Sequence, residues 1–424
     1  MSDYDLLVRS QSWEGEPLCI AVSEGVIQDV APDLQGSADQ EIDGSDCRIW
    51  QGWIDAHVHF NEPGRTDWEG LAHGSKALAL GGGTSFFDMP LNSSPPVLDK
   101  ESFEEKQRLA SITSHLDFAL WGGMTPASLL EIESMADCGA IGFKAFMCPS
   151  GLDEFLASDP KTLRRGMTLS AARGLPVAVH AEVEPKASVG GSDMKAWLAS
   201  RPIAAELEAI RIALDLAGET GCPLHIVHIS NPEGIELVMQ AKAAGVDVTA
   251  ETCPHYLLLD TEDAITIGPF AKCAPPLRGR ATVEGLREQV RRGNIDTIGS
   301  DHSPSPPELK QSDDLFSCWG GIAGIQDGFP LMIDEDLADP NMLSGNVARR
   351  FRLPGKGGLK PGHDADFILI CHDPRQIQVA DSVTRYPHSP YTGRTASHRV
   401  MATYLRGVAV SDEPRGRFLR PSQS

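Results

Sequence analysis

Two histidines lie two residues apart in the segment GWIDAHVHF, which contains Asp55, His57 and His59. Side chains alternate along a strand, so residues two apart point to the same face. Neutral imidazole is a common ligand of zinc and related divalent metals, and two imidazoles supply half of a tetrahedral shell. The H-x-H pattern is a weak signal by itself, because paired surface histidines on an edge strand look the same. The segment alone leaves both interpretations open.

Further ionisable residues stand where later strand-like runs end. His180 ends the run in VAVHAE, His228 ends the run in HIVHIS, and Asp301 follows the run in IGSDHSP. His225 is three residues from His228 and therefore faces the other side of its strand, which favours a core position for His225. His57, His59, His180, His228 and Asp301 together form a candidate ligand set for metal.

Lys144 stands in the middle of an apolar strand-like run, AIGFKAFM. Burial of an ammonium group is costly, and a desolvated lysine has a lowered pKa. Its neutral amine could act as a base or nucleophile, or take up carbon dioxide as a carbamate whose two oxygens bridge two metals. The alternative is a lysine whose stem is buried while its ammonium reaches the rim of the fold. The nearby histidines favour the carbamate.

Eight short runs rich in Val, Ile, Phe and Thr alternate with helix-like stretches between residues 53 and 303. This alternation predicts parallel βα units, and eight units over about 250 residues indicate a (β/α)8 TIM barrel, which carries catalytic groups at the carboxyl ends of its strands. The predicted strands are 53–60, 84–89, 116–121, 140–146, 177–180, 224–229, 246–251 and 297–300. The predicted helices are 68–80, 103–112, 162–172, 204–216, 234–243 and 282–291.

The two ends of the chain have a different pattern. Short alternating segments and turn signals such as Glu24-Gly25 and Asp43-Gly44 predict a small antiparallel sheet near the N-terminus. The C-terminal part has the same character. We therefore expect residues 1–51 and 352–424 to form one composite β-sandwich domain beside a catalytic barrel of residues 52–351.

Charge and composition restrict the partners. The chain has 424 residues, with 37 Lys and Arg against 59 Asp and Glu, and a formal charge of -22, which argues against nucleic acid and anionic membranes. No run of about 18 apolar residues is present, and the N-terminus does not resemble a secretory signal. We expect a cytoplasmic protein. Its nine cysteines include no C-x-x-C pair, which favours free buried thiols over disulfides or a zinc knuckle.

Taken together, these residues resemble the amidohydrolase superfamily and, within it, the cyclic amidases, which include dihydroorotases, hydantoinases or dihydropyrimidinases, and allantoinases. The resemblance covers nearly the whole chain and is strongest to the allantoinases. The segments that carry it are HVHFNEPGRTDWEG (57–70), DMPLNSSPP (88–96), GFKAFM (142–147), ETCPHYL (251–257), KCAPPLR (272–278), SDHSPSPPELK (300–310), WGGIAGIQ (319–326) and SPYTGRT (389–395).

The resemblance implies two divalent metal ions, Zn in the first place and Fe, Co or Mn as alternatives. His57, His59 and Asp301 would hold one ion and His180 with His228 the other, bridged by N6-carboxylated Lys144. A metal-activated hydroxide would open the hydantoin ring of allantoin to give allantoate. Asp301 would be the general base and then the general acid. The family also suggests a homotetramer.

The resemblance further suggests hydrogen bonds to a ureide substrate from Asn61, Asn92 and Ser303, and a backbone contact at Ala274. Turn chemistry is the alternative explanation for the Asn and Ser positions. Dihydroorotases usually carry an Arg at the position of Asn61, so a carboxylated substrate is disfavoured. A hydantoinase or dihydropyrimidinase is the nearest rival activity. A non-catalytic relative and a Schiff-base aldolase that uses Lys144 are weaker alternatives.

Overall fold

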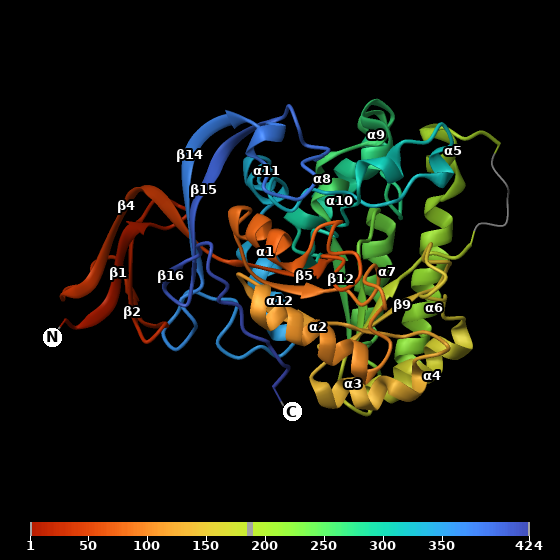
Figure 1. Cartoon of the computed structure of the whole chain (residues 1–424), viewed down its shortest axis with the longest axis horizontal. Coiled ribbons are helices and arrows are strands. Elements are labelled where there is room, and N and C mark those ends of the chain that lie inside the picture. Colours follow the sequence, from red (N-terminus) through yellow and green to blue (C-terminus); the bar gives the residue numbers. More distant parts are fainter. Residues whose placement is uncertain (1, 185–189, 423–424) are drawn as a thin grey trace.

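A barrel of parallel strands forms the body of the protein, as the computed structural model shows for residues 2–184 and 190–422 (Figure 1). All eight predicted strands are present, and the structure confirms the barrel. Parallel pairing runs through β5, β6 and β7 and through β8 to β13, and a parallel bridge from Val58 to His302 joins the ends of the two sheets. The barrel strands are β5 (Trp53–Val58), β6 (Gly83–Asp88), β7 (Asp117–Leu120), β8 (Gly122–Gly123), β9 (Phe143–Phe146), β10 (Val177–His180), β11 (Leu224–Ile226), β12 (Val248–Thr252) and β13 (Thr297–Ile298).

Helices cover the outside of the barrel, and several of them begin at an Asp or Asn that caps the first turn. Asp99 accepts a hydrogen bond from the Ser102 backbone at the start of α2, and Asp159 and Asn231 cap α4 and α7, each followed by Pro. Among the described helices, none is long and apolar enough to cross a membrane. The helices are α1 (Leu71–Leu80), α2 (Lys100–Thr113), α3 (Ile132–Cys138), α4 (Pro160–Ala171), α5 (Met194–Ser200), α6 (Ile203–Thr220), α7 (Pro232–Ala243), α8 (Pro254–Leu258), α9 (Thr261–Ile267), α10 (Arg280–Arg291), α11 (Gly328–Asp334) and α12 (Asn346–Arg350).

Both ends of the chain contribute to one seven-stranded sheet, in the order β16-β15-β14-β4-β1-β2-β3. Figure 1 shows the N-terminal strands beside β14 and β15 at one side of the barrel. The predicted composite β-domain is therefore confirmed, whereas its boundaries at residues 51 and 352 stay a prediction. Its strands are β1 (Tyr4–Gln11), β2 (Pro17–Ser23), β3 (Val26–Ala31), β4 (Ala38–Gln51), β14 (Phe367–Gln376), β15 (Thr395–Leu405) and β16 (Val408–Ala409).

The prediction of a purely antiparallel sheet was wrong at β4, because β4 pairs with β1 in parallel. The expected turn at Asp43-Gly44 lies inside β4, where the register with β1 shifts between Arg9 and Gln11. Ser10 donates a hydrogen bond to the Gly44 carbonyl at 2.8 Å, and a Cβ at Gly44 would approach the Ser10 side chain to 3.2 Å. The glycine therefore permits a close contact within the sheet instead of ending a strand.

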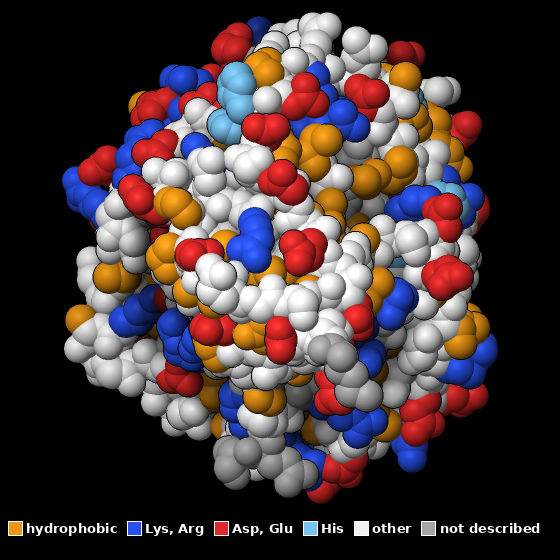
Figure 2. All heavy atoms as spheres, turned by 90° about the vertical axis from the view of Figure 1, so that its left-hand side faces the viewer, with side chains coloured by type: hydrophobic (Ala, Val, Ile, Leu, Met, Phe, Trp, Pro, Cys, Tyr) orange, Lys and Arg blue, Asp and Glu red, His pale blue; other side chains and the backbone are white. Residues whose placement is uncertain are grey.

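Apolar side chains from both ends of the chain fill the β-domain. Val8, Ile20, Phe367 and Tyr404 belong to one buried cluster, although they come from four strands across the sheet. Strands near both edges thus share one core, which makes the sheet a small sandwich. The outer face of this domain carries acidic and basic side chains scattered among each other (Figure 2).

Buried ion pairs join the barrel to the β-domain. The ammonium of Lys356 lies 2.6 Å from Asp117 at the start of β7, 2.8 Å from Asp364 and 2.6 Å from Asp366. Arg406, which follows β15, also pairs with Asp117. Because these groups are largely removed from water, the loss of one partner would leave an uncompensated charge.

Residues 417–419 also pair with the barrel. Phe118 of β7 donates from its backbone to the Arg417 carbonyl at 2.9 Å, and Leu419 donates to the Phe118 carbonyl at 2.7 Å. Phe418 packs on the ring of Phe118 with centroids 5.5 Å apart. The C-terminal segment thus forms a parallel β-bridge from Phe418 to Phe118 of β7.

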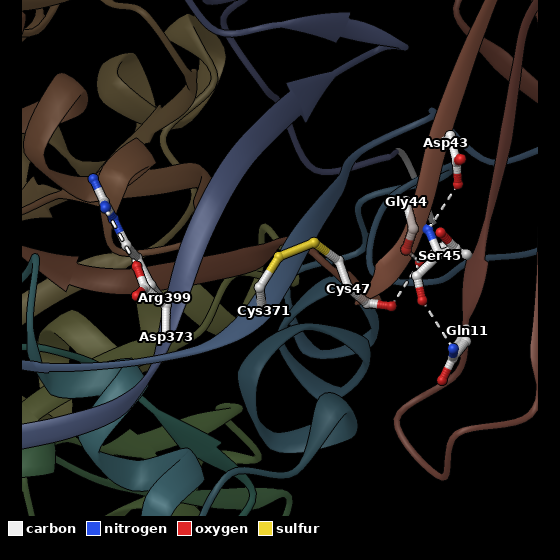
Figure 3. The surroundings of a disulfide bond; sticks show 9 residues. Gln11, Asp43, Gly44, Ser45, Cys47, Cys371, Asp373 and Arg399 are labelled. Carbon is white, nitrogen blue, oxygen red and sulfur yellow. Dashed lines mark hydrogen bonds and ion pairs between the residues drawn. A yellow bond between two sulfur atoms is a disulfide. The ribbon is translucent and has the colours of Figure 1, made fainter.

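A disulfide between Cys47 and Cys371 corrects the expectation that all cysteines are free thiols (Figure 3). The two residues are direct partners in the antiparallel pairing of β4 with β14, with Cα atoms 4.3 Å apart. The other seven cysteines, all described, are free. No local pattern indicates this pair, because its members are 324 residues apart and only the β4–β14 register brings them together.

We expect Cys371→Ser to lower the free energy of unfolding by roughly 2–4 kcal/mol under oxidising conditions, because the disulfide closes a very long loop. Thermal melting with and without a thiol reductant measures the effect. Reductant should lower the melting temperature of the wild type and of the control Cys138→Ser, but not that of Cys371→Ser. An unchanged wild-type melting temperature would contradict a stabilising disulfide.

Candidate metal centre

The carboxyl ends of the barrel strands open into a cavity of about 510 Å³. This is the end at which barrels carry their functional groups. The cavity lining includes all six residues that the sequence marked as candidate ligands, namely His57, His59, Lys144, His180, His228 and Asp301.

His57, His59 and Asp301 form a group that could hold a metal ion. The Nε2 atoms of both histidines lie 3.2 Å from the same oxygen, Oδ1 of Asp301. Both rings come from the β5 segment, and their shared direction follows from the two-residue spacing. Two imidazole nitrogens and a carboxylate oxygen are a donor set that suits a divalent metal.

His180 and His228 form a second pair. Nδ1 of His180 lies 2.9 Å from Nε2 of His228, so two imidazole nitrogens face each other in a buried place. Nδ1 of His228 has no hydrogen-bond partner among the described residues. His225, by contrast, contacts Thr249 at 2.8 Å and Glu251 at 3.2 Å, which fits a core role.

Lys144 lies on β9 with its side chain fully buried. Its Nζ has no hydrogen-bond partner within the described part of the chain, and it lies 5.1 Å from the centre of the Phe146 ring. Burial lowers the pKa of Lys144 to about 8. An unpartnered buried amine with a low pKa is unusual, because such a group normally pairs with a carboxylate.

Burial and neighbouring charges adjust the protonation of the candidate ligands. Burial lowers the pKa of His57, and it lowers the pKa of His228 well below its ordinary value, so both rings present neutral nitrogens. Burial alone would raise the pKa of Asp301, but the imidazoles of His57 and His59 outweigh it and hold that pKa well below the usual range. Asp301 is therefore an ionised proton acceptor.

Left-handed backbone conformations gather at this site. Of the eight non-glycine residues with positive φ in the described chain, four are Asn61 (66°), Asn92 (71°), His228 (42°) and Asp301 (48°). This conformation is costly for a side chain such as histidine and is found mostly where function requires it. At His228 and Asp301 it directs a candidate ligand just past the end of a strand.

Three of the four residues expected to contact substrate line the cavity. Asn92 donates to the hydroxyl of Ser303 at 3.3 Å, and Ala274 lies in the same lining. Asn61 is fully buried and donates from Nδ2 to the Pro304 carbonyl at 3.2 Å. Within the described residues, Asn61 does not contribute to the cavity lining.

Sequence reasoning missed two buried carboxylates that hold the histidines. Glu251 of β12 contacts Nδ1 of His57 at 2.7 Å, and Glu182 contacts Nε2 of His180 at 2.9 Å. Burial would raise the pKa of Glu251, but His57 and His225 lower it to about 2. Such carboxylates fix the tautomer and direction of a ligating histidine. A charged residue within or just after an apolar strand, the signal that identified Lys144, could have revealed both.

Aromatic and cationic side chains form the rest of the cavity wall. The guanidinium of Arg201 lies 5.1 Å, and the ammonium of Lys272 lies 4.3 Å, from the Trp197 ring. Lys272 also donates to the Phe316 carbonyl at 3.2 Å, and Trp319 lines the cavity near them. The cavity therefore combines polar ligands with flat apolar surfaces, as sites for small organic molecules do.

Comparisons with known proteins agree with this geometry. Residues 51–410 match the model of the Amidohydrolase family. An allantoinase from Rubrobacter xylanophilus is 48% identical over 100% of this chain and 99% of its own length, and one from Deinococcus radiodurans is 45% identical over 98% and 99%. The solved L-hydantoinase (dihydropyrimidinase) from Arthrobacter aurescens is 32% identical with a TM-score of 0.92, covering 98% of this chain and 100% of that one.

We expect Glu251→Gln to weaken the binding of added divalent metal about 10- to 100-fold, because His57 loses the carboxylate that orients it. Equilibrium dialysis with metal analysis measures the change. Glu236→Gln, an exposed change on α7, is the control and should bind metal like the wild type. Equal metal affinity in both variants would show that Glu251 does not position a ligand.

Proposed function

Because the chain belongs to the amidohydrolase family, we propose that it hydrolyses the cyclic amide of allantoin to give allantoate. The observation that carries this proposal is the similarity to allantoinases at 41–48% identity over 95–100% of the chain. Asn at position 61, where dihydroorotases usually have Arg, suits a substrate without a carboxylate. The net charge of -22 also suits a neutral substrate.

His57, His59 and Asp301 would hold one divalent ion, and His180 and His228 would hold a second. The short distances within each group and the neutral state of His57 and His228 support this assignment. Zn is the first candidate, and Fe, Co or Mn are alternatives, because imidazole and carboxylate ligands accept all four. When bound, such ions polarise a carbonyl and lower the pKa of water.

Asp301 would serve as the general base and then as the general acid. Its carboxylate is ionised and lies at the two Nε2 atoms of the β5 histidines, so it can accept a proton from the attacking water. The same carboxyl would then return the proton to the departing ring nitrogen. One residue therefore serves both halves of the reaction. Cleavage of the C–N bond leaves a neutral ureide and a carboxylic acid, which becomes a carboxylate when the second proton of the water leaves to solvent.

Lys144 would carry a carbamate between the two ligand groups. Its buried amine is unpartnered and has a pKa of about 8, so a neutral fraction can add to carbon dioxide and release a proton. Formation of the carbamate would replace the buried ammonium form of Lys144 with an anion that offers two oxygen ligands. This explains why a lysine occupies the inner face of an apolar strand.

Asn92 and Ser303 would orient the ureide, because both line the cavity and already form a hydrogen bond to each other. Ala274 would contribute backbone contacts from the same wall. Asn61 would act less directly, because its amide holds the Pro304 carbonyl near Ser303. Assembly as a homotetramer and residence in the cytoplasm stay predictions from the sequence.

Hydantoinase activity is the second candidate. The fold match to the L-hydantoinase from Arthrobacter aurescens, with a TM-score of 0.92, favours it specifically. Allantoin itself contains a hydantoin ring, so the same ligands could open either substrate. Discrimination would then depend on the cavity wall that meets the ureido group.

We expect purified, metal-loaded protein to hydrolyse allantoin faster than hydantoin, dihydrouracil or dihydroorotate in a parallel assay. In Asp301→Asn the rate on allantoin should fall about 10²- to 10⁴-fold, because the proton acceptor is lost. A direct assay of the ring-opened product, which does not rely on ammonium release, measures both the substrate preference and the rate of the variant. A preference for hydantoin or dihydrouracil would favour the second candidate, and an active Asp301→Asn would remove Asp301 from proton transfer.

We expect Lys144→Ala to bind less metal than the wild type and to lose most of its activity, because the bridging ligand is absent. Lys144→Arg is the matched variant, since it keeps the positive charge but cannot form the carbamate. Metal content and turnover, each with and without bicarbonate, test the proposal. Near-normal metal content and turnover in either variant would exclude a carbamate bridge.

A further inference from the structure

A second group of metal-type donors lies on the far side of His180. It consists of Cys148, His180 and Glu182, and the ligand atoms of these residues all lie within 4.8 Å of one another. The parallel register pairs Phe146, the last residue of β9, with His180, the last residue of β10, and Cys148 and Glu182 each follow two residues later. Neighbouring strand ends therefore build this group.

The donors are buried and chemically suited to a borderline or soft cation. Cys148 is 4% exposed, His180 3% and Glu182 1%. Thiolate, imidazole and carboxylate together match the ligand preference of Zn²⁺ and of the softer Cd²⁺. Oε1 of Glu182 has no hydrogen-bond partner among the residues that the structure describes, so this carboxylate has an unused lone pair in a buried place.

The two nitrogens of His180 point to different groups. Nδ1 faces His228 at 2.9 Å and belongs to the candidate centre, whereas Nε2 faces Glu182 at 2.9 Å. Cys148 therefore has no part in the proposed reaction. An ion bound at Nε2 would nevertheless coordinate both His180 and Glu182, the carboxylate that orients His180.

Arg201 competes with a cation at this place. Its guanidinium donates to the same Glu182 oxygen that contacts His180, and its side chain is 20% exposed and lines the cavity. A metal ion would have to displace this guanidinium toward the cavity, because two cations repel each other strongly in a buried setting. Occupation should therefore require metal in excess of that held by the proposed centre.

We propose that Cys148, His180 and Glu182 form an inhibitory site for Zn²⁺ or Cd²⁺. The ion forms bonds to Sγ of Cys148, Nε2 of His180 and a Glu182 oxygen. The thiol proton and the proton on Nε2 leave to solvent. His180 then loses its orienting carboxylate, which should reduce turnover about tenfold or more. Binding does not depend on the proposed function, whereas the loss of allantoin turnover rests on it.

Titration of the metal-loaded enzyme with cadmium chloride tests this proposal. We expect the wild type to bind one more Cd²⁺ per chain than Cys148→Ser, with the ultraviolet absorption of cadmium thiolate and a fall in turnover. Cys222→Ser is the matched control, because Cys222 is a buried free thiol that precedes β11 at the opposite end of the barrel. It should behave like the wild type. Arg201→Gln should bind the added Cd²⁺ more tightly.

Equal cadmium content and thiolate absorption in the wild type and Cys148→Ser would overturn the site. If Cys148→Ser does not fold, alkylation of the wild type with iodoacetamide and peptide mapping replaces it. Cadmium should then reduce the alkylation of Cys148 in the folded protein. Cys222 should be labelled equally with and without cadmium once the protein is unfolded. Equal labelling of Cys148 in the folded protein with and without cadmium would refute the proposal. Cadmium binding at Cys148 in a protein that never hydrolyses allantoin would contradict the proposed function alone.

Discussion

The candidate centre depends on the contacts of one buried carboxylate, that of Glu251. It accepts from Nδ1 of His57 at 2.7 Å, contacts Nε2 of His225 at 3.2 Å and accepts from the backbone of His228 at 3.3 Å. One side chain of β12 thus fixes residues from β5 and from the β11 segment. With its Nδ1 committed to Glu251, His57 presents Nε2 to Asp301. An anion buried at this depth is tolerable only because several polar hydrogens surround it.

The sequence allowed the barrel and the candidate ligands to be predicted because both follow local rules. Parallel strands buried on both faces appear as short apolar runs, and catalytic groups of barrels follow such runs directly. His180, His228 and Asp301 each satisfy that rule. Lys144 was visible because a charge inside an apolar run needs an explanation. Glu251 obeys the same logic, yet as the last residue of a predicted strand it looked like an ordinary polar boundary.

The features that escaped prediction depend on contacts between distant parts of the chain. The parallel pairing of β4 with β1 reverses the usual expectation for neighbouring short strands, and the Asp43-Gly44 signal proved to be an irregularity within β4. The disulfide between Cys47 and Cys371 requires the register of β4 on β14, which no local pattern contains. The hydrogen bond from Asn61 to the Pro304 carbonyl also escaped prediction, whereas the expected contact of Asn61 with the substrate stays a prediction. Its left-handed backbone, an ordinary property of Asn in turns, does not tell which way the amide points.

The β-bridge between the C-terminal segment and β7 has a consequence for the way the protein is made. Residues 417–419 complete an edge of the third barrel strand, and Arg417 donates from its backbone to Asp117 at 2.8 Å. The N-terminal strands likewise need β14 as a neighbour. While the ribosome is still adding residues, the nascent chain therefore has an open barrel edge and an unpartnered N-terminal sheet. Assembly therefore cannot finish until residues 417–419 have been synthesised, and until then the unpaired strand edges favour aggregation.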